Sequence, residues 1–244
     1  MTLRDLVLIR LGVAVNLVIG QIVAALLLPV YLDSVGTILV AALVGPRAAI
    51  AAGRDPLLVT LRDLVLVRLG VAVNLVIGQI VAALLLPVYL DSVGTILVAS
   101  LVGPRAAIVA GLTSQVLNAV LSGNFSWLPF AIVQVVIALY AAAAARLGLF
   151  RRLATAVPAG VGMGFVAASC SAPISYFLFG GVTAGGVTVV TTVLRALGAP
   201  LGVAVAAASY STDLLDKAIA CALVSLLLRS LPRTLAARFP ALAR

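Results

Sequence analysis

The sequence contains no histidine and no glutamate, and charged residues make up only 9% of its 244 positions. Histidine is the commonest general acid or base and the commonest metal ligand in proteins. Its absence argues against a membrane hydrolase or a metalloenzyme, so we expect no catalytic residues, no metal and no cofactor. The two cysteines, Cys170 and Cys221, each lie inside an apolar run. They are best interpreted as reduced packing residues, and they imply no disulfide framework.

Long apolar runs are abundant: 64% of the residues are hydrophobic, and the mean hydropathy is +1.30. A soluble domain of this length needs far more polar surface to cover its core. Runs such as LVIGQIVAALLL do not alternate with polar residues, as the strands of a transmembrane barrel would. The sequence therefore predicts an all-α fold, a polytopic bundle of helices in a lipid bilayer.

The formal net charge is +9, but the basic residues do not gather into a basic face. They occur mostly as single arginines between apolar runs. This pattern is typical of the cytoplasmic ends of membrane spans. It gives no indication of nucleic acid as a partner.

Near-identical copies of one segment occupy the first half of the chain. Thr2–Gly53 aligns with Thr60–Gly111 at an offset of 58 residues, and only three positions differ. The halves of membrane transporters usually show much weaker internal similarity. The near-identity indicates a recent tandem duplication, whether natural, engineered or accidental.

The second copy runs without interruption into the rest of the sequence, whereas the first breaks off and is followed by RDPLLV. We therefore interpret residues 60–244 as the functional core. Residues 1–59 are interpreted as an appended partial duplicate, a helical hairpin and a linker.

Six spans are predicted in the core, with a broken apolar stretch, Val187–Ala208, before the last of them. Gly198 and Pro200 interrupt that stretch. The appended copy adds two more spans, an even number, so it leaves the orientation of the core unchanged. The six core spans are about Leu64–Leu86, Val88–Val102, Pro104–Leu121, Leu128–Ala145, Leu153–Phe179 and Thr212–Leu231, and the added pair is about Val7–Leu28 and Val30–Val44.

Every second connection between the predicted spans carries arginine, and the others, such as SGNFSW, carry none. Because basic connections stay in the cytoplasm, both termini are expected on the cytoplasmic side of a bacterial cytoplasmic membrane. The connections without arginine are expected outside, where a polar site would lie.

Four segments, in order, carry a resemblance to a known family: LPVYLDSVGTILVASLVGPRAAIVAGL, LPFAIVQVVIAL, ISYFLFGGVTAGG and TDLLDKAIACALVSLLLRSLPRTL. Over roughly Thr60–Pro240 the chain resembles the substrate-binding S component of an energy-coupling factor (ECF) transporter, in a subgroup of uncharacterised S components. The resemblance implies a six-helix protein that captures a vitamin or a similar small molecule. It also implies a T-type transmembrane coupling protein and two cytoplasmic ATPases as partners. The extra copy at residues 1–59 departs from the family.

Asp91 lies in the repeated stretch PVYLDSVGT, at the expected outer end of the second span. In one interpretation, Asp91 or Ser92 caps the helix that follows. In the other, Asp91 contacts a ligand or latches the outer loops, because ionisable groups within membranes are usually functional. Both interpretations stay open at this stage.

The last span opens with STDLLDK, in which Asp213 and Lys217 are four residues apart and can pair on one helix face. Capping and this ion pair are the simpler role for Asp213. Asp216 and Lys217 lie about one turn deeper, where contact with a ligand is plausible. The expected substrate-binding residues are Asp91, Thr95, Asn118, Asn124, Tyr176, Thr183, Asp216 and Lys217.

Small or polar residues recur every four positions along the first span, at Gly70, Asn74, Gly78 and Ala82. Such a stripe lets another helix approach closely. It could pack inside the bundle, but the family resemblance favours docking on the T-type coupling protein. The stripe recurs in the appended copy.

Two other functions remain possible for the same scaffold, because a fold does not determine a function. One is a membrane sensor or assembly module that does not transport. The other is an engineered or non-functional duplicated variant.

Overall fold

The structure is a computed structural model that describes residues 61–84, 86, 88–183 and 186–231. The chain divides into two units, Met1–Leu64 and Val65–Arg244, and the described residues belong almost wholly to the second. The predicted spans of the appended copy and the boundary predicted at residue 60 lie outside the described residues.

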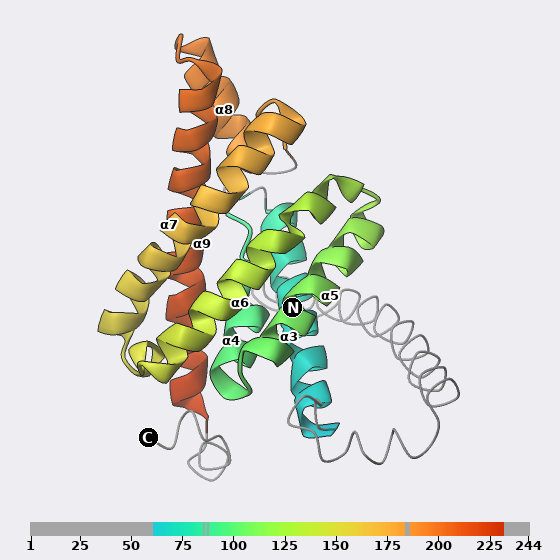
Figure 1. Cartoon of the computed structure of the whole chain (residues 1–244), viewed down its shortest axis with the longest axis vertical. Coiled ribbons are helices and arrows are strands. Elements are labelled where there is room, and N and C mark those ends of the chain that lie inside the picture. Colours follow the sequence, from blue (N-terminus) through green and yellow to red (C-terminus); the bar gives the residue numbers. More distant parts are fainter. Residues whose placement is uncertain (1–60, 85, 87, 184–185, 232–244) are drawn as a thin grey trace, which may run out of the picture. The chain divides into compact units, whose positions relative to one another are not determined.

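The described residues form helices joined by short connections, with no strand among them (Figure 1). This agrees with the predicted all-α class. In chain order the helices are α3 (Leu61–Ala83), α4 (Val93–Leu101), α5 (Pro104–Ser122), the 3₁₀ helix η1 (Phe125–Phe130), α6 (Ala131–Arg146), the 3₁₀ helix η2 (Leu149–Arg151), α7 (Leu153–Phe179), α8 (Gly186–Ala196) and α9 (Leu201–Ser230).

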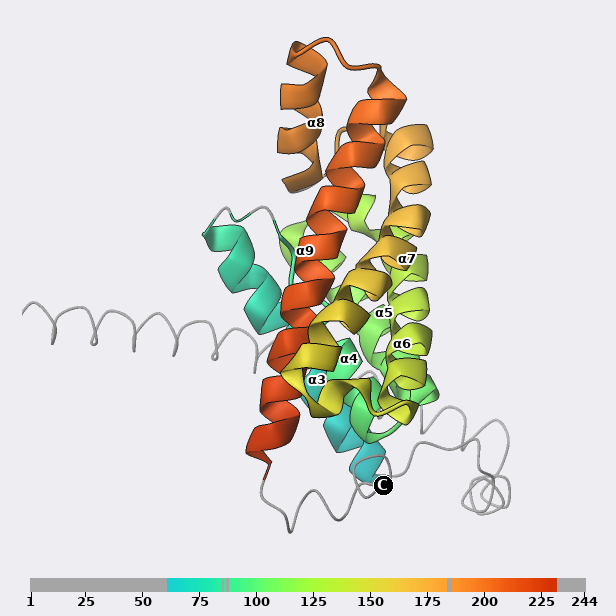
Figure 2. The same ribbon diagram turned by 90° about the vertical axis from the view of Figure 1, so that its left-hand side faces the viewer.

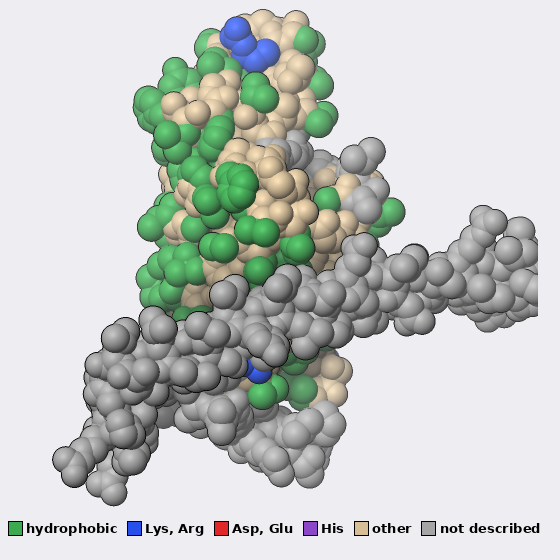
Figure 3. All heavy atoms as spheres, turned by 90° about the vertical axis from the view of Figure 1, so that its right-hand side faces the viewer, with side chains coloured by type: hydrophobic (Ala, Val, Ile, Leu, Met, Phe, Trp, Pro, Cys, Tyr) green, Lys and Arg blue, Asp and Glu red, His purple; other side chains and the backbone are tan. Residues whose placement is uncertain are grey.

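Three helical segments of the described part are long and apolar enough to cross a membrane: Val65–Ala82 of α3, Phe125–Arg146 of η1 and α6, and all of α7. Where Figure 3 shows described residues, hydrophobic side chains lie across much of their surface, and large apolar side chains are exposed on several helices. These observations are compatible with a helical membrane protein. They support three of the six predicted core spans.

The second predicted span, Val88–Val102, is not one helix. Only its second part forms α4, which has nine residues and is about 14 Å long at about 1.5 Å per residue. That is about half of the ~30 Å hydrocarbon core of a bilayer. The preceding residues, 88–92, form a connection whose backbone hydrogen-bonds to α9 instead of continuing a helix.

The last predicted span also needs correction, because α9 begins at Leu201 rather than at Thr212 and extends over 30 residues. Pro200 stands at its N-cap, where a proline costs no helical hydrogen bond. Gly198 adopts a φ of 90° between α8 and α9, which ends the preceding turn. α8 accordingly covers only the first half of the stretch Val187–Ala208.

α7 and α9 run antiparallel and pack along their length, with α8 connecting them at one end (Figures 1 and 2). Two glycines of α7 allow the helices to touch backbone to backbone. A Cβ atom at Gly160 would lie 2.4 Å from the carbonyl oxygen of Lys217, and one at Gly164 would lie 2.5 Å from that of Asp213. This close pairing brings the charged middle of α9 against α7.

Candidate functional site

The connection between α3 and α4 is bound to the middle of α9 by one carboxylate. Oδ1 of Asp216 accepts hydrogen bonds from the backbone nitrogens of Tyr89, at 2.9 Å, and Leu90, at 2.6 Å. Leu90 is buried and has a φ of 50°, a left-handed conformation that is uncommon for a residue with a side chain. The two hydrogen bonds to Asp216 hold the backbone in this strained turn.

A residue of α3 caps the N-terminus of α4. Oδ1 of Asn74 accepts from the nitrogens of Gly94, at 2.6 Å, and Thr95, at 3.3 Å, which are among the first free N–H groups of α4. The amide nitrogen of Asn74 donates to the hydroxyls of Thr95 and Ser114. One of the two interpretations assigned this cap to Asp91 or Ser92. Asn74 supplies it instead, and the Ser92 side chain makes no capping hydrogen bond.

Lys217 is the only lysine in the sequence, and its side chain is buried. Its Nζ forms ion pairs with Oδ2 of Asp216 and, at 3.9 Å, with Oδ1 of Asp91, and it donates to the Ser92 hydroxyl at 2.9 Å. The ammonium group thus joins α9 to the residues just before α4. It pairs with Asp216 and Asp91, not with Asp213 as the four-residue spacing suggested.

Asp213 lies one turn before Lys217 and is 6% exposed. Its Oδ2 accepts a hydrogen bond of 2.6 Å from the Ser171 hydroxyl on α7. No donor among the described residues reaches its Oδ1. Asp213 was expected to cap a helix or pair with Lys217, but it lies in the middle of α9 and faces a cavity.

This cavity lies between η1, α6, α7, α9 and the connection that precedes α4. The space between its walls is about 580 Å³, and part of that space is open to the outside. The centre of a water molecule can lie anywhere within about 60 Å³ of it. That is room for several waters or a small solute in contact with the walls. The lining residues are Tyr89, Asp91, Gln115, Ser126, Trp127, Phe130, Val133, Gln134, Ile137, Ser171, Ser175, Thr183, Val187, Asp213 and Lys217.

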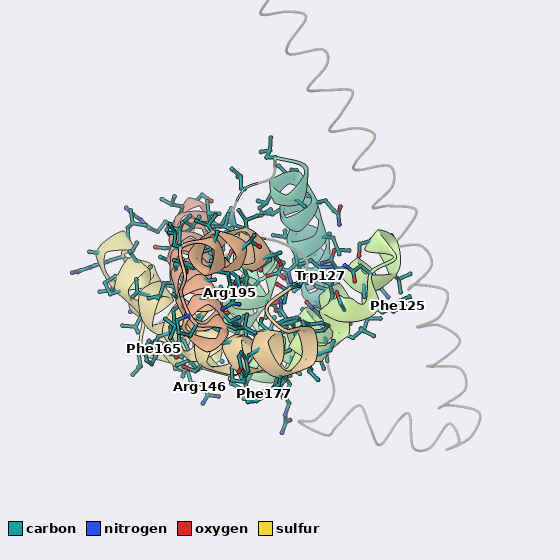
Figure 4. All side chains as sticks on the ribbon, turned by 90° about the horizontal axis from the view of Figure 1, so that it is seen from above. Phe125, Trp127, Arg146, Phe165, Phe177 and Arg195 are labelled. Carbon is teal, nitrogen blue, oxygen red and sulfur yellow. The ribbon has the colours of Figure 1, made fainter. Side chains whose placement is uncertain are left out.

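Aromatic rings form one side of the cavity. Trp127 and Tyr89 meet edge to face, with ring centroids 5.8 Å apart, and Phe130 lies beside them in the wall. In Figure 4, Trp127 lies among the inner side chains, whereas Phe165 and Phe177 lie at the periphery. The cavity therefore offers both charged groups and flat apolar surfaces to a ligand.

The structure brings four of the eight expected substrate-binding residues together. Asp91, Thr183 and Lys217 line the cavity, and Asp216 supports it from behind by fixing Lys217 and the connection. The Thr183 hydroxyl is buried and has no hydrogen-bond partner among the described residues.

The other four expected residues lie outside the cavity wall. The Thr95 hydroxyl accepts from Asn74 and donates to Gln134. Asn118 accepts from Gln79, and Asn124 accepts from the backbone and hydroxyl of Ser126 at the start of η1. Tyr176 lines a separate outer groove together with Phe177.

Several residues that line the cavity were not among the predicted substrate-binding residues. Ser171 and Ser175 are small and lie on the same face of α7 as Gly160 and Gly164; this four-residue spacing was a usable signal. Trp127 lies in the connection SGNFSW, which was expected outside the membrane, and a single aromatic residue gives no signal for a cavity. Gln115 also lines the cavity, and it donates a hydrogen bond to the carbonyl oxygen of Trp127.

The stripe of small residues on α3 is covered in part by the bundle itself. A Cβ atom at Gly94 would lie 1.9 Å from the carbonyl oxygen of Gly70, and Asn74 is buried. Gly78 lies near Asp91, while Ala82 is exposed. Gly70 and Asn74 thus make the packing contacts of the alternative interpretation, and docking at this stripe has no support from the structure.

The part of the chain that the structure describes contains no group of three or more histidine, cysteine, aspartate or glutamate residues that could hold a metal ion. No protein-family model matches the chain, and the comparisons with curated proteins and with solved structures give no match.

Proposed function

We propose that this protein is the solute-binding subunit of a membrane importer, as the sequence resemblance to ECF S components implies. The observation that supports the proposal most directly is the cavity with Asp91, Asp213 and Lys217 in its wall, inside a protein that is otherwise largely apolar. Ionisable groups at such depth are costly and mark substrate pathways in membrane proteins. A concave site with a few polar groups and several aromatic groups is typical of small-molecule binding.

In this proposal the protein lies in the cytoplasmic membrane of a bacterium, and the cavity receives its solute from outside the cell. Release into the cytoplasm depends on partners: a T-type coupling protein and two ATPases, the assembly that the resemblance implies. The solute is a vitamin or another small molecule.

The test is an inventory, by mass spectrometry, of small molecules that co-purify with the full chain. Thr183→Phe fills the cavity from the connection between α7 and α8, so the helices can keep their places. The matched control is Val182→Phe, the same change at the preceding residue, which is 69% exposed. We expect the wild type and Val182→Phe to retain a molecule that Thr183→Phe has lost. Equal recovery from all three proteins would contradict the proposal.

A further inference from the structure

The charges around the cavity do not balance. Among the described residues, three carboxylates, Asp91, Asp213 and Asp216, face one ammonium group, Lys217, in or directly behind the cavity wall. An uncompensated charge inside a protein is costly unless it is paired or hydrogen-bonded. The site therefore complements a ligand that brings positive charge.

Lys217 is already engaged by protein groups. Asp216, Asp91 and Ser92 surround its Nζ, so an anionic ligand would have to compete with two carboxylates for it. Asp213, by contrast, receives one hydrogen bond from the described part of the chain, donated by the neutral Ser171 hydroxyl. α9 places two charged residues in the wall. Of these, Asp213 is the one that can still accept hydrogen bonds from a ligand.

Two further features point to the rest of the ligand. The rings of Trp127, Tyr89 and Phe130 offer flat apolar surfaces, and aromatic faces also attract cations. The buried Thr183 hydroxyl, which has no partner among the described residues, is a hydrogen-bonding group in the wall that a ligand can satisfy.

We infer that the cavity binds a protonated amine carried on a flat apolar or aromatic body, with the ammonium group at Asp213 and the body against Trp127. The inference rests on the proposed function and names the class of its solute. The ammonium group donates to Oδ1 of Asp213 and replaces the missing positive charge.

Trp127 is the only tryptophan of the chain, so its fluorescence reports occupancy of the cavity. Three probes share a phenyl ring and differ in charge: phenethylamine, phenethyl alcohol and 3-phenylpropionate. With the purified full chain, we expect phenethylamine to quench Trp127 with an affinity about tenfold higher than the alcohol, the contribution of one hydrogen bond to a charged group. The anion is expected to bind most weakly.

Asp213→Asn keeps the shape of the side chain and removes its charge. We expect it to abolish the tenfold preference for the amine while the alcohol binds as before, which shows that the variant is folded. The matched control, Asp63→Asn, removes a carboxylate of α3 that does not line the cavity, and its preference is expected to stay.

Equal affinities for the three probes, a preference for the anion, or no quenching by any probe would overturn the inference. So would an unchanged preference in Asp213→Asn. None of these results alters the inventory of molecules from the Thr183→Phe and Val182→Phe proteins, which tests solute binding itself. The two proposals can therefore fail separately.

Discussion

Asp216 connects the middle of α9 to the residues that precede α4. One oxygen holds the backbone of Tyr89 and Leu90, and the other pairs with Lys217. Because the group is fully buried, its ion pair is not screened by solvent in the way a surface pair would be. Without Asp216, Lys217 retains only the more distant Asp91 as a charged partner, and without Lys217 these carboxylates have no ammonium partner among the described residues.

We expect Asp216→Asn to destabilise the protein by about 3 kcal/mol, since breaking a buried pair by removing one partner is strongly unfavourable. The double variant Asp216→Asn with Lys217→Met also removes the ammonium partner of Asp91, so it should be less stable than the single variant. Unfolding in a denaturing detergent, followed by Trp127 fluorescence, measures both. A double variant that is as stable as Asp216→Asn, or more stable, would contradict this account of the shared ammonium group.

The contacts of these residues show what a sequence can and cannot indicate. Asp91, Asp216 and Lys217 were selected as candidates because charges are rare among apolar residues. Their actual partners were not predictable, since Lys217 and Ser92 are 125 positions apart in sequence and meet only when α9 packs beside the connection. Helical spacing suggested the local pair of Asp213 and Lys217 because it ignores such distant partners.

At the level of helices, backbone contact between α7 and α9 determines where the charged groups stand. Gly164 has the carbonyl oxygen of Asp213 and Cα of Leu214 directly opposite it. Any side chain there separates the two helices. Asp213 would then move away from Ser171, which holds it at the cavity.

We expect Gly164→Ala to destabilise the protein by about 1–3 kcal/mol, the usual cost of forcing extra atoms into a packed contact. Gly162→Ala is the matched control on the same helix. Its Cβ atom would meet mainly the hydroxyl end of Tyr140, a side chain that can move, so a smaller loss is expected. Detergent unfolding of the two variants compares them, and equal losses would show that the backbone contact is not the cause.

Helix bounds that follow from the length of an apolar segment were predicted correctly. Helix bounds that depend on a contact with a distant part of the chain were not. The bounds of α7 agree with the predicted Leu153–Phe179, because a long and mainly apolar segment lies between the arginines that precede it and the glycine-rich connection that follows it. Hydropathy placed the start of α9 too late. Hydropathy also placed α4 and the preceding connection in one predicted span, because a buried connection that hydrogen-bonds to another helix is as apolar as a membrane span.

At the scale of the whole chain, the site uses a segment that the sequence contains twice. Asn74 caps α4 in the second copy, and Asn16 is its equivalent in the first. The residues that hold the connection, Asp216 and Lys217, occur once. The sequence therefore contains two copies of the stretch PVYLDSVGT but only one set of the α9 residues that hold it.

We expect Asn16→Leu to leave stability nearly unchanged, because the described structure is built on the second copy. Asn74→Leu leaves the buried backbone N–H groups at the start of α4 without an acceptor, which costs about 1–3 kcal/mol for each group. The first copy carries the same groups, however, and can replace the second. The variant with both changes should therefore be clearly less stable than Asn74→Leu alone. Thermal unfolding of the four proteins decides, and equal stability of Asn74→Leu and the double variant would exclude replacement.

Only one copy of the stretch PVYLDSVGT can occupy the attachment point on α9 at a time. The copies differ only at Ile9/Val67, Ala42/Ser100 and Ala51/Val109, so the length of the connecting chain decides between them. Val102 and Gly103 join α4 to α5 in the described structure, whereas use of the first copy would require a connection of about 60 residues, roughly five doublings at about 0.6 kcal/mol each. The second copy is therefore expected to predominate by about 3 kcal/mol, and the first is expected to take its place only when a substitution weakens the second by more than that.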